Sequence, residues 1–165
     1  MIKSLFQKVV VGYNGSRSSL NALMYSILMA KIYKCRVKVV YVVDTDSIKK
    51  LTITKFLMKD ESHNLESDLQ LDAGKDLAYA EKLAKSKGVK IETEIRYGAV
   101  WSEIITSADD YKAELILLGG VDNSSVSKMV RHGMLGKQDS EIIGSAHCSV
   151  MVVRHPQIEQ LFRIS

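Results

Sequence analysis

A short, unbroken run of apolar residues that ends in two glycines constrains this chain most. Leu115-Ile-Leu-Leu118 is followed directly by Gly119-Gly120. Four consecutive apolar residues favour a strand buried on both faces of a parallel sheet, and glycines at its end indicate that another backbone approaches closely. Residues 120–136 are basic and glycine-bearing, and a helix is expected to start at Lys137. Because helix N-termini attract anions, we predict a phosphate-binding loop over 120–136.

Five apolar runs alternate with helical patterns along the chain, which predicts βαβ units and a parallel sheet. The expected strands cover residues 8–13, 37–43, 90–97, 115–118 and 150–153. The third strand alternates apolar with charged residues, so it belongs at a sheet edge. With right-handed crossovers, the sequence predicts a three-layer, Rossmann-like α/β sandwich whose five-stranded sheet has the order 3-2-1-4-5.

The last strand, residues 150–153, is apolar throughout although this order places it at the opposite edge of the sheet. An uncovered apolar edge strand invites pairing with another chain. We therefore expect a homodimer that forms through this strand.

Residues 44–63 are the least regular part of an otherwise periodic chain. Two interpretations stay open: an irregular excursion that packs over the sheet edge, or a lid over a ligand at the strand ends. A long helix is expected to follow and to end at Gly88. At 165 residues the chain is expected to form a single domain, 1–165.

Composition argues against several classes of protein. The net charge of +4 is spread along the chain, so we expect no nucleic-acid partner. No apolar stretch reaches the ~20 residues of a membrane span, and residues 1–8 do not resemble a signal peptide. The two cysteines lie outside any CxxC pattern, which predicts reduced thiols in a cytoplasmic protein. The four histidines show no spacing typical of metal ligands.

Five segments, in order and at the right separations, resemble the universal stress protein family. Ala113-Glu-Leu-Ile-Leu-Leu-Gly119 is similar to the family's Ala-Asp-Leu-Ile-Val-Met-Gly. Ser145-Ala-His-Cys-Ser-Val-Met-Val-Val-Arg154 is similar to its His-Ala-Pro-Cys-Pro-Val-Leu-Val-Val-Arg. Residues 8–16, 39–43 and 98–105 match its first two strands and the entry to its third helix.

The resemblance implies a fold that is often dimeric and that, in one branch of the family, binds ATP. In that branch the motif Gly-x-x-Gly-x9-Gly-Ser/Thr surrounds the phosphates, and backbone of the second strand contacts adenine. Carried onto this chain, the site would include Tyr13 and Asn14 after the first strand, the backbone of Val42, and Gly119 and Gly120. Asn14 replaces an aspartate, so it brings no charge to a magnesium ion, but its amide oxygen can accept a hydrogen bond.

The third glycine of the motif can be assigned in two ways. Counting back from the C-terminal segment selects Gly136, followed by Lys137, with a loop four residues longer than the motif. Counting from Gly120 through Asn123 selects Gly133 at the motif's own spacing. Asparagine can stand for glycine where φ must be positive. Neither glycine is followed by Ser or Thr.

Two functions follow from these observations. One is a dimeric regulator that holds ATP or another adenine nucleotide, with or without magnesium, at the carboxyl ends of the strands. The alternative is a nucleotide-free member of the same family that serves as a protein-interaction module. No general base, metal-binding carboxylate pair or activated nucleophile can be named, so we expect no clear enzymatic turnover, although a weak ATPase activity stays open.

Overall fold

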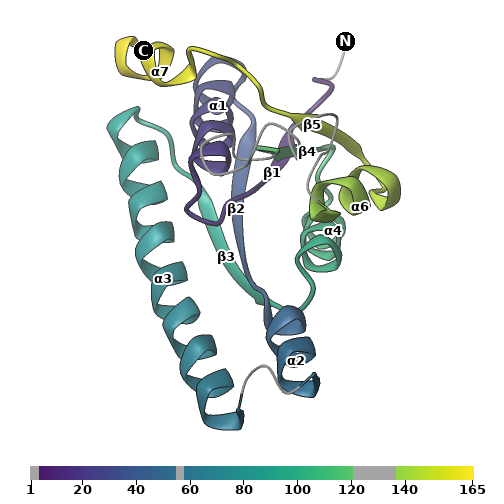
Figure 1. Cartoon of the computed structure of the whole chain (residues 1–165). Coiled ribbons are helices and arrows are strands. Elements are labelled where there is room, and N and C mark those ends of the chain that lie inside the picture. Colours follow the sequence, from purple (N-terminus) through teal and green to yellow (C-terminus); the bar gives the residue numbers. More distant parts are fainter. Residues whose placement is uncertain (1–3, 55–57, 121–136) are drawn as a thin grey trace.

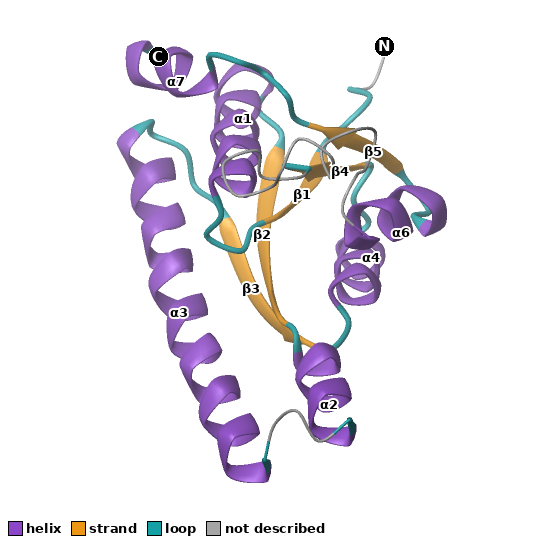
Figure 2. Cartoon of the chain, viewed as in Figure 1, coloured by secondary structure: helices purple, strands orange, loops and turns teal. Residues whose placement is uncertain are grey.

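A five-stranded parallel sheet organises the protein, as a computed structural model that describes residues 4–54, 58–120 and 137–165 shows (Figures 1 and 2). The strands are β1 (Lys8–Gly12), β2 (Arg36–Val43), β3 (Glu92–Tyr97), β4 (Leu115–Leu118) and β5 (Ser149–Val152). Their order is β3-β2-β1-β4-β5, and every pairing is parallel. The predicted order and both predicted edge strands are confirmed.

Helices cover both faces of the sheet and complete the predicted three layers. Helices α1 (Arg17–Tyr33), α3 (Lys59–Ser86) and α7 (Ile158–Ile164) lie on one face, and α4 (Val100–Tyr111) and α6 (Lys137–Ser145) on the other. Successive residues of a strand point to opposite faces, so Val9 and Val11 join the first core while Val10 joins the second. All three valines are fully buried, as the continuous apolar run predicts.

Two helices account for most of the described residues in the segment 44–63. Asp44 caps helix α2 (Thr45–Ile53) because its carboxylate accepts hydrogen bonds from the backbone N of Ser47 at 3.0 Å and from Ser47 Oγ at 2.7 Å. Helix α3 then begins at Lys59, earlier than the apolar stripe predicts. Figure 1 shows α2 beside the N-terminal half of α3, both extending beyond the carboxyl edge of the sheet.

Helix α7, like α2, is an element that periodicity did not predict. Its buried side chains, Ile158 and Phe162, pack into the core formed by α1 and α3. The Lys87 ammonium lies 4.7 Å from the centroid of the Phe162 ring, and Arg17 pairs with Glu159 at 3.4 Å. Within the described ranges, no helix is both long enough and apolar enough to cross a bilayer.

We expect Phe162→Ala to lower the free energy of unfolding by about 3 kcal/mol, because it removes a buried ring and leaves a cavity. Ile164→Ala is the matched control on the same helix. Ile164 is 82% exposed, so its truncation should change stability by less than about 0.5 kcal/mol. Urea denaturation of the two variants gives both values, and equal effects would show that α7 does not dock as described.

Candidate functional site

A cleft of about 470 Å³ opens at the carboxyl ends of β1, β2 and β4. Parallel α/β sheets bind ligands at this edge, where the strand order reverses and the covering helices diverge. The volume lies within the ~300–1,000 Å³ typical of small-molecule sites. Apolar side chains from β2, β4, α4 and α6 form much of the wall: Val42, Val100, Ile104, Leu118 and Ile142.

Backbone groups of β2 are left unpaired on the side that faces the cleft. The ladder between β1 and β2 ends where the backbone N of Tyr13 donates to the carbonyl oxygen of Val40 at 3.0 Å. Residues two apart on a parallel strand direct their N–H and C=O groups toward the same neighbour. The N–H and C=O groups of Val42 therefore point to the same side of β2 as those of Val40, the side on which β1 lies. The strand β1 ends at Gly12, which pairs with Val40, so it does not extend to Val42. Among the described residues, the N–H and C=O groups of Val42 have no hydrogen-bond partner.

Short polar side chains fix the loop between β1 and α1. Ser16 caps α1, since its Oγ accepts from the backbone N of Ser19 at 3.2 Å. Ser19 Oγ donates to Asn14 Oδ1 at 2.9 Å. Ser18 Oγ donates to the carbonyl oxygen of Gly120 at 3.3 Å. The loop is therefore tied both to the first turn of α1 and to the end of β4.

The amide oxygen of Asn14, which the sequence analysis expects to accept a hydrogen bond from a ligand, is engaged within the loop. Its Oδ1 already accepts from the backbone N of Ser16 at 3.0 Å and from Ser19 Oγ at 2.9 Å. The amide nitrogen has no hydrogen-bond partner among the described residues. Asn14 would therefore donate a hydrogen bond, not accept one.

Two tyrosines stand at the boundary between the cleft and α3. Tyr13 and Tyr41 both line the cleft. Burial, followed by the charge of Asp76, raises the pKa of Tyr13 to about 12, and the same two causes raise the pKa of Tyr41. Burial and the neighbouring Asp72 raise the pKa of Asp76 in turn. Both tyrosines stay protonated at neutral pH and offer neutral hydroxyl groups.

The charged side chains that line the described part of the cleft are both carboxylates, Asp44 and Asp139. Burial raises the pKa of Asp139 above its usual value. Its neighbour Gln138 holds α6 against α4, because Gln138 Oε1 accepts a hydrogen bond from the backbone N of Trp101 at 3.0 Å. Across the described ranges, no group of three or more His, Cys, Asp or Glu side chains is placed to hold a metal ion.

Gly119 lies where β4 meets the first turn of α1. A Cβ atom on Gly119 would collide with the backbone carbonyl of Ser18 and would lie 2.6 Å from the backbone N of Ser19. Gly120 adopts a φ of +73°, in the left-handed region that favours glycine. Packing and backbone conformation therefore explain both glycines before any ligand is considered.

The sequence model of the universal stress protein family matches residues 5–154. The chain belongs to this family. The match covers the whole sheet, whereas helix α7 lies beyond it. The family resemblance predicted from the five sequence segments is confirmed.

Individual universal stress proteins agree with this assignment. One from Methanocaldococcus jannaschii is 32% identical over 158 residues, which cover 95% of this chain and 87% of the relative. The structure of UspA from Lactobacillus plantarum has a TM-score of 0.73 at 19% identity, over 92% of this chain and 100% of that one. A universal stress protein in complex with cAMP has a TM-score of 0.63 at 24% identity, over 92% and 99%.

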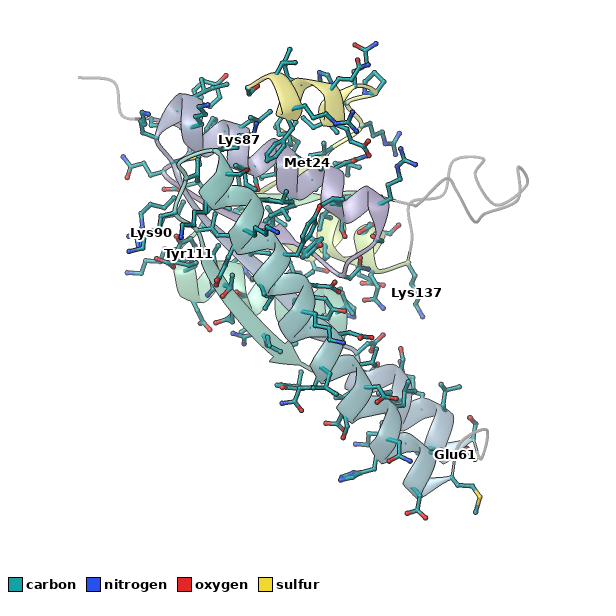
Figure 3. All side chains as sticks on the ribbon, turned by 90° about the vertical axis from the view of Figure 1, so that its left-hand side faces the viewer. Met24, Glu61, Lys87, Lys90, Tyr111 and Lys137 are labelled. Carbon is teal, nitrogen blue, oxygen red and sulfur yellow. The ribbon has the colours of Figure 1, made fainter. Side chains whose placement is uncertain are left out.

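Five of the nine predicted site residues of this universal stress protein line the cleft, and the structure brings them together from β1, β2 and β4: Tyr13, Asn14, Val42, Gly119 and Gly120. Lys137 is exposed at the start of α6 and does not line the cleft (Figure 3). The other three, Asn123, Gly133 and Gly136, lie outside the described residues, as does most of the predicted phosphate loop 120–136.

Sequence reasoning missed the two carboxylates of the cleft. Asp44 could have been found, because it follows β2 directly and so lies at the same sheet edge as Asn14. Asp139 gives no such signal, since its place in the cleft depends on how α6 packs against α4.

We expect Gly119→Ala to destabilise the protein by about 2 kcal/mol or more with no ligand present, because the new methyl group overlaps the backbone of α1. Gly74→Ala is the control. A Cβ on Gly74, in the middle of α3, would meet nothing within 4 Å, so this change should raise stability by roughly 0.5–1 kcal/mol. Thermal unfolding measures both. A Gly119→Ala protein as stable as the wild type would contradict the close packing.

Proposed function

We propose that this universal stress protein binds an adenine nucleoside or nucleotide in the cleft between β1, β2 and β4, and that it acts as a regulator without clear turnover. The observation that carries the proposal is the unpaired backbone of Val42 at the end of β2. Adenine presents an amino donor beside ring-nitrogen acceptors, which complements one backbone C=O and one N–H group. The universal stress protein solved with cAMP supports the same class of ligand.

The walls of the cleft suit a flat, weakly polar base. Val100 and Ile104 come from α4, and Leu118 and Ile142 from β4 and α6. Burial of an aromatic ring against such side chains supplies most of the affinity in small-molecule sites, while a few polar groups fix its orientation. Here those polar groups are the backbone of Val42 and the amide nitrogen of Asn14.

Calorimetric titration with AMP and with ATP, each with and without magnesium, tests this function. We expect saturable binding near one ligand per chain. Val100→Phe should weaken binding at least about tenfold, because the added ring occupies the volume of the base. Val89→Phe is the matched control, since Val89 is another half-buried valine but follows the C-terminal end of α3, outside the lining of the cleft.

The possible results separate the two functions that the sequence left open. Equal loss of binding in both phenylalanine variants would place the ligand elsewhere. No heat and no thermal shift for the wild type at millimolar ligand would refute nucleotide binding and favour the alternative, a nucleotide-free interaction module.

We also propose that two copies pair through β5. This strand is a sheet edge, and Val150, Met151 and Val152 are half-buried on it. The backbone N of Val153 donates to the carbonyl oxygen of Leu118 at 2.8 Å, so the N–H of Val152 points away from the sheet. That outward row of backbone groups is available to a second edge strand.

Val152→Pro is therefore expected to block pairing without removing a hydrogen bond within the sheet. Sedimentation velocity should give about twice the 18.4 kDa chain mass for the wild type and the single-chain mass for the variant. Far-ultraviolet circular dichroism should show the same helix content for both. A monomeric wild type, or a variant that stays dimeric, would contradict pairing through β5.

A further inference from the structure

The charged side chains on the described part of the cleft wall are both negative. Twenty described residues line it, and they include Asp44 and Asp139 but no lysine, arginine or histidine. Phosphate sites normally place cations or free helix N-termini beside the anion. The described wall offers the first turn of α1 and neutral donors, but its charged side chains are both negative.

Asp139 brings a carboxylate to the lining of the cleft at the start of α6. It lies in the first turn of α6, and an acidic side chain there already satisfies the positive end of the helix dipole. The hydrogen bond from the backbone N of Trp101 to Gln138 Oε1 fixes this turn against α4, and Asp139 lines the cleft beside Gln138. Lys137, the cation next to them, is exposed and does not line the cleft.

The direction in which a bound ligand extends follows from the order of the strands. A base held by Val42 lies on the β1 side of β2. Groups attached to it would extend into the rest of the cleft, whose lining beyond the end of β1 includes Gly119, Gly120 and Asp139 in the first turn of α6. Each added phosphate therefore brings more negative charge toward Asp139.

We propose that Asp139 makes this cleft selective for adenine ligands of low charge, adenosine and AMP, over ATP. The proposal rests on the adenine site proposed above and assigns its specificity to one carboxylate. Like charges in a partly buried site repel each other more strongly than in bulk water, because the local dielectric constant is lower. A tail of three phosphates meets this repulsion more strongly than a single phosphate does.

Titration of the full-length protein with adenosine, AMP and ATP at constant ionic strength tests the assignment. We expect the wild type to bind ATP at least about fivefold more weakly than AMP. Asp139→Asn keeps the shape of the side chain and removes its charge, so it should bring the AMP-to-ATP ratio close to one, mainly by tightening ATP. Adenosine affinity should change little.

Glu141→Gln is the matched control, because it removes the same charge from the same helix at an exposed position outside the lining of the cleft. It should leave the ratio unchanged. Wild-type protein that binds ATP as tightly as AMP, or an Asp139→Asn ratio equal to that of the wild type, would overturn the selectivity while leaving adenine binding intact. Absence of binding for all three ligands would overturn both proposals.

Discussion

The close contact between the end of β4 and the first turn of α1 determines the shape of the cleft. Gly119 lies against the backbone of Ser18 and Ser19 with no room for a side chain. The hydrogen bond from Ser18 Oγ to the carbonyl oxygen of Gly120 holds the same two elements together. Because this contact needs glycine for packing alone, the presence of Gly119 does not distinguish nucleotide-binding universal stress proteins from those that bind none.

Some polar groups of the candidate site already hydrogen-bond within the fold, and others do not. Asn14 Oδ1 and the hydroxyl groups of Ser16 and Ser19 hydrogen-bond to one another and to the loop backbone. The backbone of Val42 and the amide nitrogen of Asn14 have no partner in the part of the chain that the structure describes. Recognition by backbone depends on where β1 ends rather than on which side chain follows it, so such a site tolerates the exchange of aspartate for asparagine.

The buried parts of the fold were predictable from the sequence, because a strand covered on both faces must be apolar at successive positions. Leu115–Leu118 is an example in which even the bounds agree. Short or polar elements were harder to predict. Helix α2 depends on the Asp44–Ser47 cap, and α7 on Ile158 and Phe162 reaching a core built by distant helices. Asp139 was missed for a related reason, since its position in the cleft follows from the packing of α6 against α4.

Asp44 links the cleft to the helical pair α2–α3. Its carboxylate lines the cleft, and the same group accepts two hydrogen bonds from Ser47 that start α2. Leu69, from the middle of α3, lines the cleft as well. A ligand that donates a hydrogen bond to the Asp44 carboxylate would share this acceptor with Ser47, which Asp44 caps at the start of α2. A ligand that contacts only Val42 and Asn14 would not. Whether α2 and α3 would respond to binding therefore depends on a ligand's contact with Asp44 or Leu69.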